Sequence, residues 1–132
     1  MKVEKGDFLG IMGKSGCGKS TLHAGARTSG PADGRKDYFE DFDTEELWKD
    51  ELADIRRRKI GFIFQDYYLM DSLTVRENMI LPMILDKADS AEMKKRAEKY
   101  AEQFEISHLL DKKPTELSGG EKQRAAICRA LI

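Results

Sequence analysis

The chain has 132 residues, enough for one domain at most, and its 23 basic and 24 acidic side chains give a net charge of -1. A pI near 6.2 argues against nucleic-acid binding, and the longest apolar stretch, 79–85, is too short for direct membrane insertion and contains Pro82. The two cysteines, Cys17 and Cys128, lie far apart and do not indicate a disulfide-stabilised secreted fold.

A glycine-rich loop follows the first predicted strand. The apolar run 8–12 is typical of a buried strand. Residues 13–20 then match G-x-x-x-x-G-K-[ST] at every specified position, which defines a Walker A loop. Its glycines allow backbone amides to surround a phosphate. Lys19 can neutralise β- and γ-phosphate oxygens, and the Ser20 hydroxyl can bind Mg²⁺, so the loop predicts a nucleotide site.

A helix over 44–58 and a strand over 60–64 are expected next. Asp43 and Glu46 have the spacing of a capping box. The run 60–64 is apolar without alternation, as in a strand covered on both faces of a parallel sheet. Gln65 follows directly. In a protein with a phosphate loop, a polar side chain at such a strand end is placed to reach Mg²⁺ or the attacking water.

Helices dominate the second half of the chain. Thr74 and Glu77 form a capping box that predicts a helix, which Pro82 should bend or end. Residues 90–105 place apolar side chains on one face and charged ones on the other, which predicts an amphipathic helix. Residues 121–132 predict a last helix with Ala125, Ala126, Ile127, Ala130 and Leu131 packed inward.

The octapeptide LSGGEKQR, residues 117–124, precedes and opens this last helix. Ser118 can supply an N-cap oxygen or a hydroxyl donor, and the two glycines after it let backbone amides approach an anion closely. The octapeptide therefore predicts a second phosphate-binding element.

With a Walker A loop, Gln65 and LSGGEKQR in this order, the sequence resembles the ATP-binding cassette (ABC) ATPases from about Val3 to Ile132. Residues 61–65 and 73–78 look like the branch that serves macrolide exporters, lipoprotein-release complexes and peptide-efflux systems. The resemblance implies an α/β P-loop NTPase (RecA-like) fold, with a mostly parallel sheet core and an α-helical subdomain that carries the signature octapeptide. The core is expected over about 1–66 and 125–132, and the helical subdomain over about 67–124.

The resemblance also implies a set of site residues. The Mg²⁺ ligands correspond to Ser20 and Gln65, and Gln65 also belongs to the nucleotide site. The residues that bind the ATP phosphates correspond to Gly13, Lys14, Ser15, Gly16, Cys17, Gly18, Lys19, Ser20 and Thr21. The residues that contact the nucleotide of a second subunit, in trans, correspond to Ser118, Gly119, Gly120 and Gln123.

The sequence departs from the family pattern in three places. In the stretch 22–37 the helix after the phosphate loop lacks its large apolar residues, and one hypothesis is a pair of compensating frameshifts. The family's Walker B aspartate, catalytic glutamate and switch histidine should follow Ile132, and an adenine-stacking aromatic should precede the chain. The chain thus resembles a fragment truncated at both ends, without catalytic residues of its own. We expect weak nucleotide binding and negligible hydrolysis from it alone.

For the whole protein, the resemblance implies an ATP-hydrolysing subunit of an ABC transporter. Two such subunits would sandwich two ATP molecules head to tail, and transmembrane permease subunits would export or release a substrate. Its location would be cytoplasmic, at the inner face of the cell membrane. One alternative is a soluble ABC-type ATPase of DNA repair or translation, although those carry long insertions between Gln65 and the signature. A kinase-type P-loop enzyme would leave LSGGEKQR unexplained.

Overall fold

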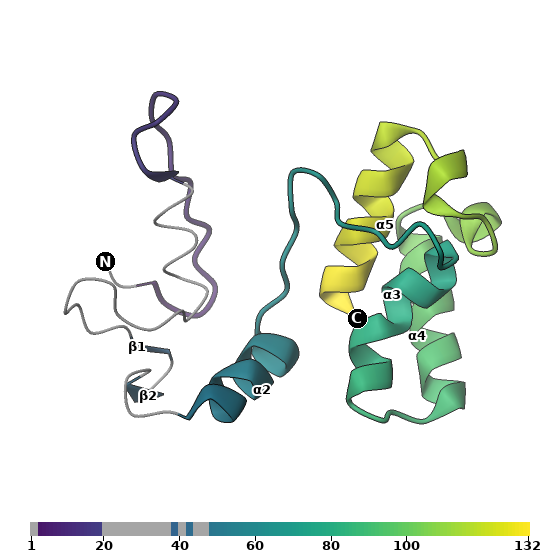
Figure 1. The fold of residues 1–132 in the computed structure, drawn as a ribbon, viewed down its shortest axis with the longest axis horizontal. Helices are drawn as coiled ribbons and strands as arrows, with labels where there is room; N and C mark the ends of the chain where they lie inside the picture. Colours follow the sequence, from purple (N-terminus) through teal and green to yellow (C-terminus); the bar gives the residue numbers. More distant parts are fainter. Residues whose placement is uncertain (1–2, 20–37, 40–41, 44–47) are drawn as a thin grey trace. The chain divides into compact units, whose positions relative to one another are not determined.

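Residues 3–19, 38–39, 42–43 and 48–132 are described by a computed structural model (Figure 1). The chain divides into two units, Met1–Arg56 and Arg57–Ile132. Ser20, Thr21, the stretch 22–37 and residues 44–47 lie outside the described residues. The helix expected over 44–58 begins only at Lys49, because Trp48 is not helical and its N–H is bonded to Glu51. No helix in the described part of the chain is long and apolar enough to cross a membrane.

The first unit contains a short hairpin and most of a helix. Strands β1 (Tyr38–Phe39) and β2 (Phe42–Asp43) pair antiparallel, with Tyr38 opposite Asp43 and Phe39 opposite Phe42. Helix α2 (Lys49–Lys59) continues into the second unit. Its first turn is closed by the Trp48 N–H, which donates to Glu51 Oε2 at 2.8 Å.

The prediction of strands at 8–12 and 60–64 is wrong for the described backbone. Both segments lack helix and strand, and the ladder between β1 and β2 is the one sheet found within the described ranges. A strand exists only where a neighbouring backbone accepts and donates its hydrogen bonds. Without such a neighbour the apolar side chains stay in solvent, and Phe8 and Met12 are 102% and 94% exposed.

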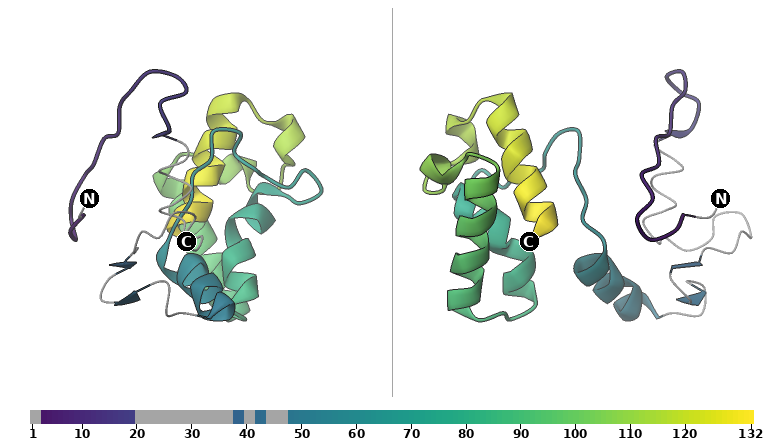
Figure 2. Two further views of the ribbon diagram at one scale, coloured as in Figure 1. Left: turned by 60° about the vertical axis from the view of Figure 1, so that its left-hand side comes forward. Right: turned by 180° about the vertical axis from the view of Figure 1, so that it is seen from behind.

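Three helices pack against one another in the second unit, and each contacts both of the others (Figures 1 and 2). Two short 3-10 helices, Ser107–Leu109 and Pro114–Glu116, connect the last two of them. The three helices are α3 (Val75–Leu85), α4 (Ser90–Gln103) and α5 (Gly119–Leu131).

A single apolar cluster holds these helices together. Burial of apolar surface is the main favourable term in folding, so this cluster is the stabilising core of the unit. Of the side chains expected inward on the last helix, Ala125 and Ala126 are buried, Ile127 and Ala130 are half-buried, and Leu131 is exposed. The predicted amphipathic helix is confirmed, because α4 contributes two alanines to the cluster. Its members are Val75, Met79, Ala97, Ala101, Ile106, Leu109, Leu110, Leu117, Ala125 and Cys128.

Helix α3 begins as predicted but does not end at Pro82. The Thr74 N–H donates to Glu77 Oε2 at 2.7 Å, and the Glu77 N–H donates to Thr74 Oγ1 at 3.3 Å, which completes the capping box. The helix continues to Leu85. Proline removes one helical hydrogen bond, and the burial of Met79 and Met83 on either side holds the helix together across that gap.

Candidate functional site

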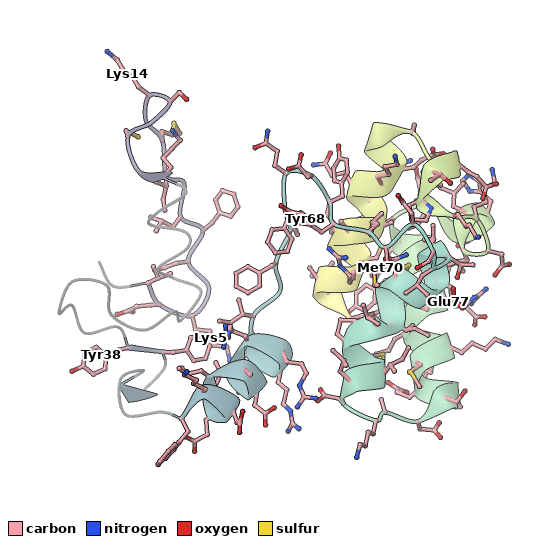
Figure 3. The ribbon with its side chains drawn as sticks, viewed as in Figure 1. Lys5, Lys14, Tyr38, Tyr68, Met70 and Glu77 are labelled. Atoms are coloured by element: carbon pink, nitrogen blue, oxygen red, sulfur yellow. The ribbon has the colours of Figure 1, made fainter. Side chains whose placement is uncertain are left out.

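The glycine-rich loop closes around the ammonium group of Lys19. Lys19 Nζ donates to the Gly13 carbonyl at 2.7 Å and to the Lys14 carbonyl at 2.8 Å. A longer contact of 3.7 Å joins it to Cys17 Sγ. Lys14 stands at the tip of the loop and points away from it (Figure 3). The positive charge inside the loop is therefore that of Lys19, while Lys14 faces solvent.

Glycine is required at two positions of this loop, and a third glycine lies close to Cys17. Gly16 and Gly18 have φ values of +80° and +90°, in the left-handed region that side chains disfavour. A Cβ on Gly13 would lie 2.5 Å from Cys17 Sγ, so no larger residue fits there without a shift. The backbone from Gly13 to Cys17 is exposed. An open loop of amides with an ammonium group is a donor set suited to a phosphate.

Lys19 can also accept an additional ligand. An ammonium group has three N–H donors, and its two short bonds to carbonyls leave one donor facing only the distant Cys17 sulfur. A phosphate oxygen is a much better acceptor than this thiol, because it carries negative charge whereas a thiol sulfur is a weak neutral acceptor. The loop thus fits the phosphates of a nucleotide.

Gln65 lies in a turn that follows the extended segment 60–64. The Tyr67 N–H donates to the Phe64 carbonyl at 3.2 Å and closes this turn. Gln65 is exposed, and its amide makes no hydrogen bond with the residues that the structure describes. The amide is therefore free to bind a ligand from solvent.

The signature octapeptide forms the N-terminus of α5. Ser118 Oγ donates to Glu121 Oε2 at 2.6 Å, and the Ser118 N–H donates to the same oxygen at 2.7 Å. These hydroxyl and backbone donors hold the pKa of Glu121 below its ordinary value of 4.5. Gly119 and Gly120 lie exposed in the first turn, and Gln123 is exposed one turn later. The predicted contact residues of the signature thus share one accessible helix end.

The structure brings the turn after Gln65 to the signature helix. A Cβ on Gly119 would lie 3.6 Å from the hydroxyl of Tyr67, and Arg129 of α5 donates to the Tyr67 and Tyr68 carbonyls. The Walker A loop belongs to the other unit. Ser20 lies outside the described residues, so its predicted pairing with Gln65 around Mg²⁺ stays a prediction. No group of three or more His, Cys, Asp or Glu side chains in the described ranges could hold a metal ion.

Sequence reasoning missed Asn78, which organises the chain after Gln65. Its side chain is fully buried. Its Oδ1 accepts from the Met70 N–H at 2.7 Å, and its Nδ2 donates to the carbonyls of Met70 at 3.0 Å, Thr74 at 2.9 Å and Leu73 at 3.3 Å. The available signal was an uncharged amide directly before the apolar run 79–85. Buried amides need partners, and the partners here come from a loop.

Comparison with known proteins gives consistent results along the whole chain. A family model described as "ABC transporter" matches residues 1–132. The uncharacterized ABC transporter ATP-binding protein YvcR of Bacillus subtilis is 45% identical over 100% of this chain and 51% of its own length. The macrolide export ATP-binding/permease protein MacB of Campylobacter jejuni is 41% identical over 100% of this chain and 21% of its own. The bacitracin export ATP-binding protein BceA of Halalkalibacterium halodurans is 39% identical over 100% of this chain and 52% of its own.

A solved structure is similar in fold as well as in sequence. It is the dimeric ATP-binding cassette MJ0796 in a post-hydrolysis state bound to ADP and Pi. The TM-score is 0.89 at 38% identity, over 99% of this chain and 58% of that one. This similarity confirms the predicted α/β P-loop NTPase class. The chain spans about half the length of YvcR, BceA and MJ0796, and about a fifth of MacB.

Proposed function

The chain belongs to the ABC transporter family, and from this premise we propose that it forms the nucleotide-binding part of an ATPase subunit that energises export through membrane partners. As an ABC ATPase domain, it is of the class that binds ATP. The observation that carries the proposal for this chain is the Walker A loop closed around Lys19, whose ammonium lies 2.7 Å and 2.8 Å from two loop carbonyls.

In this proposal the loop receives the β- and γ-phosphates of ATP. The exposed amides of 13–18 donate to phosphate oxygens, and Lys19 exchanges its weak contact with Cys17 for an ionic hydrogen bond. Ser20 and Thr21 would complete the phosphate contacts. Ser20 and Gln65 would hold Mg²⁺, which spreads the negative charge that develops during phosphoryl transfer. The exposed amide of Gln65 supports this assignment.

The signature helix is proposed to act on the nucleotide of a second subunit. Ser118 and Gly120 would face the γ-phosphate, with Gly119 and Gln123 beside them. Support comes from the exposure of this helix end and from MJ0796, whose printed description is of a dimer. ATP binding would close such a pair, and hydrolysis would reopen it. The isolated chain is expected to bind ATP weakly and to hydrolyse it negligibly.

Transport is proposed as the use of this ATPase. MacB and BceA are named as proteins of macrolide and bacitracin export, and MacB is named as a permease as well. These names favour a transport role, with transmembrane permease subunits as partners, over a soluble ATPase of DNA repair or translation. The subunit would then act at the cytoplasmic face of the membrane. In proteoliposomes with its permease partner, ATP turnover by the full-length protein should rise when cargo is added.

Binding of a fluorescent ATP analogue to the chain tests the central step. Lys19→Ala should weaken binding roughly ten- to hundredfold, because a hydrogen bond to a charged group contributes about 1.5–3 kcal/mol. Lys99→Ala is the matched control, since Lys99 is an exposed lysine on α4. Equal affinities of the wild type and Lys19→Ala would contradict the proposed nucleotide site.

A further inference from the structure

Two consecutive tyrosines just after Gln65 adopt a backbone conformation that tyrosine disfavours. Tyr67 has a φ of 61° and Tyr68 a φ of 44°. Bulky residues persist in the left-handed region only where surrounding structure holds them there. The turn has one main-chain bond of its own at each residue, from Tyr67 to Phe64 and from Tyr68 to Asp66. A contact from outside the turn is needed to hold it.

Arg129 supplies that contact from the last turn of α5. Its Nη2 donates to the Tyr67 carbonyl at 2.7 Å, and its Nη1 donates to the Tyr68 carbonyl at 2.5 Å. The carbonyls of both strained residues thus accept from one guanidinium, whose planar fork suits two neighbouring acceptors. The bond to the Tyr67 carbonyl is partly buried, which strengthens it relative to the same bond in water.

The turn touches both ends of α5. Its Tyr67 carbonyl meets Arg129 near the C-terminal end, and the Tyr67 hydroxyl lies near Gly119 at the N-terminal end. Tyr68 is packed edge-on against Phe64, with ring centroids 4.9 Å apart. Figure 3 shows Tyr68 and Met70 on the segment that passes α5 and leads into α3. The segment after Gln65 is therefore attached along the signature helix.

We propose that Arg129 is a positioning residue that latches the strained turn at Tyr67 and Tyr68 to α5, so that Gln65 moves with the helix that Ser118 begins. The inference rests on the proposed roles of Gln65 in one nucleotide site and of Ser118 in another. When one nucleotide displaces the signature helix, Arg129 transmits the movement to Gln65, the proposed Mg²⁺ ligand at the other nucleotide. Arg129 itself touches neither nucleotide.

Amide hydrogen exchange of the chain tests the latch without any nucleotide. Arg129→Gln should speed exchange at the Tyr67 and Tyr68 amides at least about tenfold, because local opening no longer breaks two charge-assisted bonds. Arg129→Lys, which keeps the charge without the fork, should give a smaller increase. The control is Arg96→Gln, which removes a guanidinium that donates to the Ile132 carbonyl and to Glu92, outside the turn.

The exchange rates of the core decide whether the effect is local. Residues 97–106 should exchange within about twofold of the wild type in every variant. Unchanged rates in the turn of Arg129→Gln would overturn the proposal. An equal acceleration in the turn and in 97–106 would also overturn it, because Arg129 would then only stabilise the unit as a whole.

A rescue experiment tests the role of strain. Glycine adopts positive φ without a steric penalty. In the Tyr68→Gly background, Arg129→Gln should therefore speed exchange at Tyr67 less than about threefold. If Arg129→Gln speeds exchange at Tyr67 as much in this background as it does with Tyr68 present, backbone strain plays no part in the latch.

The Mg²⁺ dependence of ATP binding provides a readout that a purely structural role would not change. Arg129→Gln should leave ATP affinity in EDTA within about twofold of the wild type and reduce the gain produced by Mg²⁺ at least about threefold. An undiminished gain would contradict the positioning role. A wild-type chain that binds no ATP would contradict the proposed function, and the exchange rates would then decide the latch alone.

Discussion

Replacing Asn78 by leucine should destabilise the helical unit by about 2–4 kcal/mol. The side chain is fully buried and makes four hydrogen bonds to main-chain groups of residues 70–74. Leucine has a similar volume, so the substitution removes these bonds without opening a large cavity. The loss of stability therefore measures the hydrogen bonds.

The magnitude follows from what each partner retains. The Met70 N–H loses its acceptor and would face a buried leucine, and a donor left unsatisfied away from water costs about 1–3 kcal/mol. The Met70 carbonyl keeps the Leu73 N–H at 3.1 Å, and the Thr74 carbonyl keeps the Asn78 N–H at 2.9 Å. The two N–H donors of the Asn78 amide serve three carbonyls, the third being Leu73 at 3.3 Å, so their loss adds about 0.5 kcal/mol for each donor. Most of the loss thus comes from Met70.

Urea unfolding followed by far-UV circular dichroism measures the change, because the helices of this unit supply most of the signal. Gln103→Leu is the matched control, since it makes the same chemical change at an exposed position of α4 and should stay within about 0.5 kcal/mol of the wild type. A loss below about 0.5 kcal/mol in Asn78→Leu would refute the reasoning, because the buried amide would then contribute no net hydrogen bonding.

Three further predictions concern the phosphate loop, the signature helix and the thiols. Gly18→Ala should weaken ATP-analogue binding roughly tenfold, because the φ of +90° at Gly18 strains any residue with a side chain; binding like the wild type would contradict this requirement for glycine. The folded-state pKa of Glu121 is lowered, so the stability it contributes is present above about pH 4.5 and is lost as pH falls through the folded pKa. Ser118→Ala should move that pKa back toward 4.5 in an NMR titration of the carboxyl group, whereas an unchanged titration would mean that the hydroxyl is not its partner. Cys17 is exposed, while burial raises the pKa of Cys128 to about 11. A thiol reagent at about pH 8 should therefore modify only Cys17 in the folded chain, and Cys128 only in urea. Fast modification of both cysteines in the folded chain would contradict the burial of Cys128.

The starts of α3 and α5 were predictable because capping is local, whereas α2 begins at Lys49 and not after Asp43. Thr74 with Glu77 and Ser118 with Glu121 are three residues apart, so sequence spacing alone places their hydrogen bonds. The two strands could not be predicted in the same way. A strand depends on a partner that is distant along the chain, and the apolar runs 8–12 and 60–64 carry no information on whether that partner is present.

Long-range contacts explain what sequence reasoning missed at the site. Arg129 reaches carbonyls 61 and 62 residues away, and Asn78 bonds to main-chain atoms of a preceding loop. Because every residue type has a main-chain carbonyl and almost every type has an N–H, the partners of Arg129 and Asn78 cannot be recognised from the sequence. The shape of the loop around Lys19 follows from its glycines, whereas the nucleotide contacts and the division into 1–66 with 125–132 and 67–124 stay predictions.

The carboxylate of Glu121 already occupies the anion-binding end of α5. Both the hydroxyl and the backbone N–H of Ser118 donate to it, at 2.6 Å and 2.7 Å. A phosphate that approaches Ser118 must therefore compete with an internal anion for the same donors, and the two negative charges repel each other. The Glu121 carboxylate keeps the donors of Ser118 hydrogen-bonded while no phosphate is present. It also makes a bound phosphate easier to release. If Ser118 contacts a phosphate as proposed, that contact should be reversible, with one anion exchanged for another.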